Sequence, residues 1–201
     1  MVVTIIGLSA VAFAPGIGRA TTDRRVSTAA RELIRIGRRA RADTFGYLRA
    51  HLIWITPSTG VVQLLRGATN SCTLAVANWP DVQSDCAAPA VPGTSRCVEN
   101  LSIPAITTGS TVVMYEETLV SNAPSYSNTA LRALCYAPNG LVYWGTGTTI
   151  TTATAALTDT NSSAVNGGFV YTLSKGPGAP LTSTRVHRVL FPLGGTARSL
   201  R

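Results

Sequence analysis

The sequence predicts an α+β fold, in which a long N-terminal helix packs on an antiparallel β-sandwich of about eight strands. Three observations support this prediction. The first eighteen residues, MVVTIIGLSAVAFAPGIG, carry no charge, and the next segment repeats arginine at helical spacing. Beyond residue 50 the chain is rich in Gly, Pro, Thr and Ser, and its apolar runs are short. We therefore expect an apolar half-helix over 1–20, an amphipathic half-helix over 21–46 and a β-rich domain over 47–201.

The apolar start of the chain is typical of a secretion signal or of a membrane helix. No basic residue precedes Val2, and cleavage at the small-residue site Ala12–Ala14 would fall directly before Pro15, so a cleavable signal fits poorly. A membrane helix needs about twenty apolar residues, and this run is slightly shorter. We expect the membrane half of a helix whose start was trimmed or assigned too late, with a kink at Pro15 and Gly16.

The next segment predicts an amphipathic helix. Thr21 or Thr22 can cap it, and it runs to about Phe45, where Gly46 ends it. Apolar and small residues recur every three or four positions and predict a narrow face that packs on a sheet: Val26, Ala30, Leu33, Gly37 and Ala40. A second face carries Arg24, Arg31, Arg35 and Arg38, and Glu32 can pair with Arg35.

The remaining chain predicts strands separated by turn residues. LRAHLIWIT and VVQLLRG, joined by PSTG, predict a first hairpin. The further strand candidates are SCTLAVA, TVVMYEETLV, LRALCYA, LVYWG, GFVYTLS and TRVHRVLF. No internal repeat is visible, so one helix followed by about eight strands is the expected order.

The net charge of +8 is concentrated at the two ends of the chain. The segment 19–49 holds nine arginines against three carboxylates, and the segment 175–201 holds five cations and no acid. The middle has three arginines against six carboxylates. Basic ends indicate contact with nucleic acid or anionic lipid, or simply a well-solvated helix face, and the last reading is the more common.

Four cysteines lie in the β-rich part, and their spacing matches neither a redox pair nor a zinc site. Four cysteines allow three pairings. A local bridge between Cys86 and Cys97 would stabilise a Pro-rich loop by about 2–3 kcal/mol. That bridge would leave Cys72 to pair with Cys135.

The residue types that carry catalysis are sparse and scattered. His51 and His187 lie in candidate strands without a neighbouring nucleophile motif. Glu116 and Glu117 are adjacent in a strand and must point to opposite faces, which argues against a paired acid and base. We expect a protein that is not an enzyme and binds no cofactor or metal.

The order of these features resembles type IV pilin-like proteins, and in particular the GspH/FimT group of minor pilins and pseudopilins. The resemblance rests on MVVTIIGLSAVAFAPG, ELIRIGRRARADTFG, LCYAPNGLVYWG and TRVHRVLFPLGGTARSL, which cover both ends and the centre of the chain. It implies a structural subunit of a type IV pilus or type II secretion pseudopilus, near the tip. The implied partners are other pilin subunits, and the implied location is the inner membrane with a periplasmic domain, before assembly into a filament.

Two alternatives stay open beside this reading. Some FimT-like proteins bind DNA through a C-terminal Gly-Arg-x-Arg element, and the matching positions here read Gly195, Thr196, Ala197 and Arg198, without the first arginine. A DNA-binding patch would then be formed by Arg185, Arg188, Arg198 and Arg201. The second alternative is an anchored or secreted β-sandwich adhesin or binding module.

Overall fold

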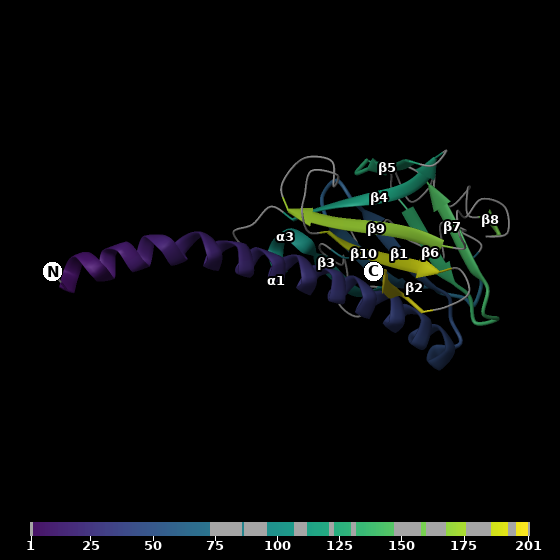
Figure 1. The fold of residues 1–201 in the computed structure, drawn as a ribbon. Helices are drawn as coiled ribbons and strands as arrows, with labels where there is room; N and C mark the ends of the chain where they lie inside the picture. Colours follow the sequence, from purple (N-terminus) through teal and green to yellow (C-terminus); the bar gives the residue numbers. More distant parts are fainter. Residues whose placement is uncertain are drawn as a thin grey trace.

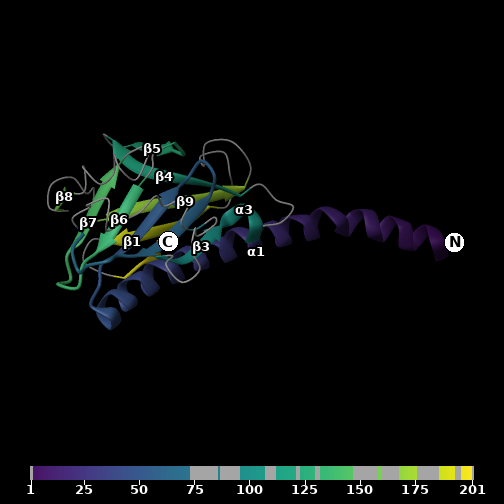
Figure 2. The same ribbon diagram turned by 180° about the vertical axis from the view of Figure 1, so that it is seen from behind.

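A computed structural model describes residues 2–72, 86, 96–106, 112–120, 123–129, 132–146, 158–159, 168–175, 186–192 and 196–200. Helix α1 (Val2–Tyr47) begins the chain. Its N-terminal part, drawn in purple, extends away from the strands, and its C-terminal part lies along them (Figures 1 and 2). The side chains of α1 are described from Asp23 onward. The helix continues through Pro15 and Gly16, and the kink there stays a prediction.

The strands form two antiparallel sheets. The first sheet has six strands in the order β3-β2-β1-β6-β7-β8. Their bounds are His51–Thr56 for β1, Val61–Arg66 for β2, Cys97–Ser102 for β3, Arg132–Tyr136 for β6, Val142–Thr146 for β7 and Thr158–Asp159 for β8. The second sheet has five strands in the order β11-β10-β9-β4-β5. Their bounds are Val112–Val120 for β4, Ala123–Ser127 for β5, Gly168–Lys175 for β9, His187–Pro192 for β10 and Arg198–Leu200 for β11.

The hairpin of β1 and β2 is the one expected from the sequence, with Thr56 opposite Val61. Gly60 closes the turn with a φ of 66°, a backbone conformation that residues with a Cβ rarely adopt. A short helix, α3 (Ile103–Ile106), follows β3, and the Ile103 amide donates to the Gly60 carbonyl at 2.9 Å. The turn is therefore held by a hydrogen bond from the start of α3 as well as by its own backbone conformation.

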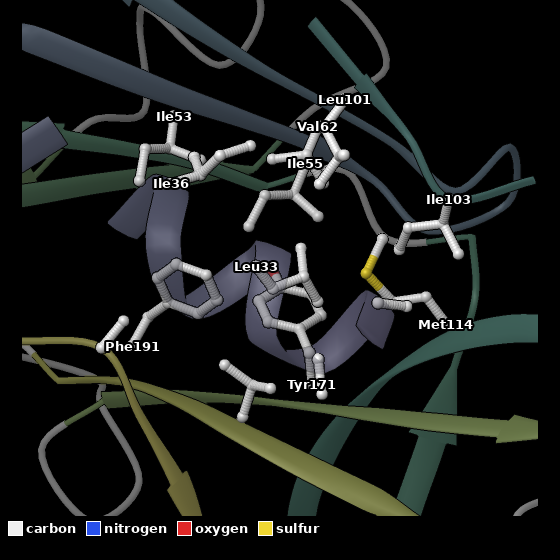
Figure 3. Close-up of a cluster of buried hydrophobic side chains, with 14 of the residues drawn as sticks. Leu33, Ile36, Ile53, Ile55, Val62, Leu101, Ile103, Met114, Tyr171 and Phe191 are labelled. Carbon is white, nitrogen blue, oxygen red and sulfur yellow. The ribbon is translucent and has the colours of Figure 1, made fainter. Parts of the chain in front are cut away.

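The main core lies between the two sheets, and α1 fills part of it. Leu33 and Ile36 of the helix are fully buried. On one side they meet the first sheet, and on the other they face Tyr171 and Phe191 of the second sheet (Figure 3). The rings of Tyr171 and Phe191 pack edge to face with centroids 5.7 Å apart. The C-terminal part of the helix is thus covered by both sheets.

A second apolar cluster covers the outer face of the first sheet. It contains Leu52 and Trp54 of β1, whose side chains alternate with those that point into the main core. The disulfides Cys72–Cys135 and Cys86–Cys97 belong to the same cluster. They are the two pairs expected from the sequence. They bond Cys72 to β6 and Cys86 to β3 on this face of the sheet.

The predicted fold class is wrong. We expected a long helix packed on the outside of a sandwich of about eight strands. Within the described residues there are two separate sheets of six and five strands, and the helical segment that packs with them is the shorter Asp23–Tyr47. Bulky residues on more than one side of this segment explain the difference, because Leu33 and Ile36 must be covered by both sheets.

The predicted location is also contradicted. Among the residues that the structure describes, no helix is both long enough and apolar enough to cross a membrane. We therefore withdraw the expectation of a single-pass inner-membrane protein.

Candidate functional site

The side of α1 that points away from both sheets is lined with arginine. A helix turns by about 100° per residue, so positions separated by three, four or seven residues share a face. The exposed residues on the side opposite Leu33 and Ala40 include Arg24, Arg31, Arg35, Arg38, Ala42 and Phe45. We call this set the arginine face. The sequence predicts its four arginines but not its apolar members.

A shallow groove runs along the arginine face. It is lined by Arg31, Ile34, Arg35, Arg38, Arg39 and Ala42. Ile34 is half-buried and packs against the main core, and Ala42 has a short side chain. Both therefore lie below the long arginine side chains, which makes the floor of the groove apolar and its walls cationic.

Carboxylates already occupy one wall of the groove. Arg35 Nη1 donates to Glu99 Oε2 at 3.0 Å, its Nη2 donates to Oε1, and Arg39 Nη1 donates to Oε2 at 2.8 Å. Arg35 Nε also donates to Glu32 at 2.6 Å, the pair expected from the sequence. Hydrogen bonding to Arg35 lowers the pKa of Glu99, and the bond from Arg35 to Glu99 raises the pKa of that arginine. Arg35 and Arg39 therefore hold the Glu99 carboxylate in the charged form.

Two edge strands hold α1 from opposite sides. Glu99 belongs to β3, the edge of the first sheet. On the other side, Arg38 Nε donates to the carbonyl of Ala197 at 3.3 Å, beside β11, the edge of the second sheet. A Cβ at Gly37 would lie 2.6 Å from the Ala197 Cβ, so the backbones are in close contact there. These contacts fix the rotation of the helix about its axis and thereby the direction of the arginine face.

The C-terminal end of α1 exposes large apolar side chains. Phe45, Tyr47 and Leu48 are 47%, 59% and 68% exposed. Arg41 lies over the Phe45 ring at 5.9 Å from its centroid, and Arg66 lies over the Tyr47 ring at 5.5 Å. Leu48 has a φ of 52°, which is uncommon for a residue with a branched side chain and turns the chain sharply into β1. Exposed apolar side chains are thus continuous with the end of the arginine face.

All five residues of the packing face expected from the sequence are buried in α1: Val26, Ala30, Leu33, Gly37 and Ala40. The buried face also includes Ala29, Ile36 and Thr44, which the sequence analysis did not name. Residues 29, 33, 36, 40 and 44 are spaced by three or four, so the same periodicity would have found them. The buried face is wider than predicted because both sheets contact it.

The structure places only part of the predicted DNA-binding patch. Arg185 and Arg201 lie outside the described residues. Arg198 is exposed in β11, but Arg188 in β10 binds a buried carboxylate: its Nε donates to Glu117 Oε2 at 2.8 Å and its Nη2 donates to Oε1. Thr172 Oγ1 also donates to Glu117 Oε2, at 3.0 Å. Because Arg188 is committed to Glu117, it contributes little cationic character to a patch on this sheet.

Glu116 points to the opposite side of the same strand, as expected for adjacent residues. Its buried carboxylate accepts a hydrogen bond from Arg132 Nε at 2.9 Å, which joins the two sheets. Burial raises the pKa of Glu116, and Arg132 opposes that shift. Within the described residues, Glu116 Oε2 and the hydroxyl of Tyr171 have no hydrogen-bond partner. Neither glutamate faces the other, so they form no acid–base pair.

His51 lies fully buried beneath the end of α1. Its Nδ1 is 3.0 Å from the Arg49 carbonyl oxygen and 3.2 Å from Thr44 Oγ1. A carbonyl can only accept, so Nδ1 carries the proton. Burial lowers the pKa of His51, which favours the neutral ring. His51 connects α1 to β1, whereas His187 lies half-buried at the start of β10.

Among the described residues, no three His, Cys, Asp or Glu side chains are grouped as a metal site would require. Comparison of the chain with protein-family models, with curated proteins and with solved structures gives no match. The arginine face, with its apolar floor and bound carboxylates, is the candidate interaction surface within the described residues.

Proposed function

We propose that this chain is a structural subunit of a helical filament, of the minor pilin or pseudopilin type that its sequence resembles. One observation carries the proposal. A single helix, Val2–Tyr47, is held between the two sheets at its C-terminal part and extends away from them at its N-terminal part (Figure 1). The extending part includes the eighteen-residue segment without charge.

An uncharged helix that leaves its own domain needs apolar surroundings. Burying a Val, Leu or Ile side chain is worth about 1.5–3 kcal/mol, and the segment contains three Val, three Ile and one Leu. Copies of this helix packed side by side would remove that surface from water. The partners in this proposal are other subunits with similar helices.

The fixed end of the helix supports the same proposal. A subunit that is positioned through one helix needs that helix to be rigidly joined to its domain. Glu99 from β3 and the Ala197 carbonyl beside β11 hold α1 from two sides, and both sheets bury its inner face. Forces on the helix are therefore transmitted to both sheets.

The experiment compares self-assembly of the full chain with that of two arginine variants. Leu8→Arg places a charge in the uncharged segment, and Leu141→Arg places the same charge at a 44% exposed position in the turn before β7. Each protein is purified in a neutral detergent, the detergent is diluted, and assembly is followed by sedimentation and negative-stain microscopy.

We expect wild type and Leu141→Arg to form elongated assemblies and Leu8→Arg to stay dispersed. Assembly of Leu8→Arg to the same extent as wild type would show that the uncharged segment does not drive association. Dispersed protein in all three samples would equally contradict the proposal.

A further inference from the structure

We propose that the arginine face binds an acidic amphipathic helix of a different protein. This inference goes beyond the proposed function, because it concerns a surface outside the uncharged segment and a partner that is not another copy of this chain. Four features of the described residues carry it: the spacing of the arginines, the apolar floor, the bound carboxylate and the charge of the chain itself.

The spacing of the arginines matches a helical partner. Arg31, Arg35 and Arg38 lie on successive turns of α1, about 5.4 Å apart along the helix axis. Carboxylates placed three or four residues apart on another helix have the same repeat. Arg35 is already paired with Glu32 and Glu99, so a helix lying along the groove would bring its carboxylates to Arg31 and Arg38.

The floor of the groove selects an amphipathic partner over a purely charged one. Ile34 and Ala42 line the groove between the arginines, and Phe45 continues this apolar line at the C-terminal end of α1. Apolar side chains on the inner face of a partner helix would cover these three residues. Such helix-in-groove contacts combine an apolar centre with a charged rim.

Glu99 shows how a carboxylate binds on this surface. It accepts hydrogen bonds from Arg35 and Arg39, and its side chain is only 17% exposed. Arg31 and Arg38 are the next arginines along the groove and are exposed. A partner carboxylate at either position would repeat the geometry that Glu99 already adopts.

The charge of the chain argues against a second copy as the partner. The protein has nine acidic residues against seventeen Lys and Arg. Within the described part of the chain, five of the acidic residues are already in ion pairs: Glu32, Asp43, Glu99, Glu116 and Glu117. Two copies of so basic a chain would repel each other at this face. The required row of carboxylates must come from a different protein.

A nucleic acid fits this face less well than a protein. Glu32, Asp43 and Glu99 lie among the arginines and would repel a phosphate backbone, which is charged along its whole length, whereas a helix can carry carboxylates opposite Arg31 and Arg38 alone. An apolar floor also gives phosphates no contact. The mixture of arginine, carboxylate and apolar side chains is instead typical of a protein interface.

The test uses a fluorescent helical peptide of about four turns, with Glu three or four residues apart on one side and Leu beside them. Its binding to the full chain in neutral detergent is measured by anisotropy. The groove variant is Arg31→Glu with Arg38→Glu, and the matched control is Arg49→Glu with Arg198→Glu, which makes the same charge change at two exposed arginines outside the groove. A peptide with Gln in place of Glu and a duplex DNA oligonucleotide are the comparison probes.

We expect the groove variant to lower the affinity for the Glu peptide at least about tenfold and the control pair less than about threefold, because long-range charge is screened by salt and local pairing is not. A peptide with Lys in place of Glu should bind the groove variant more tightly than wild type. That reversal shows that the variant is folded and that the contact is at these positions.

Three results would overturn the proposal. Equal loss in the groove and control variants would indicate nonspecific charge attraction. Equal binding of the Glu and Gln peptides would show that carboxylates are not recognised. Tighter binding of DNA than of the peptide, lost in the groove variant, would assign the face to nucleic acid. Because Leu8→Arg leaves the groove intact, it should keep peptide binding, so this proposal and the assembly proposal can fail separately.

Discussion

The close contact at Gly37 makes a sharp prediction about how α1 is held. A methyl group at this position would lie 2.6 Å from the Ala197 Cβ and 2.9 Å from Phe191 Cε1. Real Cβ atoms do not approach other carbons so closely, so Gly37→Ala must displace β11 or the Phe191 ring. Overpacking of this kind costs about 1–3 kcal/mol.

The same substitution also has a favourable effect on the helix. Alanine is about 0.8–1.0 kcal/mol better than glycine inside a helix. The net loss of unfolding free energy should therefore be about 0–2 kcal/mol. Gly46→Ala is the matched control, because a Cβ there meets nothing within 4 Å. It should leave the stability unchanged or raise it by up to about 1 kcal/mol.

The assay is urea unfolding followed by circular dichroism, with both disulfides intact. A double-mutant cycle of Gly37→Ala with Ala197→Gly isolates the contact, since removing the Ala197 methyl group relieves the closest clash. We expect the second change to restore part of the loss. If Gly37→Ala stabilises the protein as much as Gly46→Ala does, α1 does not pack against β11 in the way described.

Three further predictions concern the groups that hold the helix and the sheets. Glu99→Gln should lower the unfolding free energy by about 1–2 kcal/mol, because it weakens two partly exposed ion pairs. The pKa of Glu99 is lowered from 4.5 in the folded state, so this contribution is present above pH 4.5 and is lost as the pH falls through the lower pKa of the folded state. The melting temperatures of wild type and variant should therefore converge in acid. Burial lowers the pKa of His51 below 6.5, so the unfolded state binds the proton more readily than the folded state does. The unfolding free energy of wild type should therefore fall below pH 6.5, by at most about 1.4 kcal/mol per pH unit. His51→Gln should flatten that slope in urea titrations between about pH 7.5 and 5.5. Replacing Cys72 and Cys135 by alanine should lower the unfolding free energy by about 4 kcal/mol, and replacing Cys86 and Cys97 should lower it by about 3 kcal/mol, because the bridges span 63 and 11 residues. The reverse order in calorimetry would contradict the loop-entropy account.

The strands that the sequence predicts and those that it misses differ in their place in the sheets. Each of β1, β2, β4, β6, β7, β9 and β10 has two neighbouring strands, and all seven overlap predicted apolar runs, with β7, β9 and β10 ending one residue beyond them. The four missed strands are β3, β5, β8 and β11, the edges of the two sheets. An edge strand buries less of its surface, so CVENLS, APSYS, TD and RSL show no apolar pattern. The predicted strand SCTLAVA lies largely outside the described residues.

The arginine face could be predicted from its spacing, but its carboxylates could not. Glu32 is one turn from Arg35 and is visible in the sequence, whereas Glu99 lies 64 residues from Arg35 and comes from an edge strand that carries no strand signal. The ion pair of Arg188 could not be predicted for the same reason. Its partner Glu117 is 71 residues away and is reached only through the pairing of β4, β9 and β10. Long-range ion pairs depend on strand order, which local periodicity does not encode.

The bond from Arg38 to the Ala197 carbonyl joins residues 159 positions apart, one in α1 and the other just before β11. The inner face of α1 is also covered by β9 and β10, both late in the chain. During synthesis the helix therefore leaves the ribosome long before the strands that cover it, and its apolar face must stay exposed until they arrive. Contacts of such large sequence separation close slowly, because a long loop must be ordered first. A chain truncated before β10 would leave Leu33 and Ile36 without the cover of Phe191 and should aggregate during synthesis.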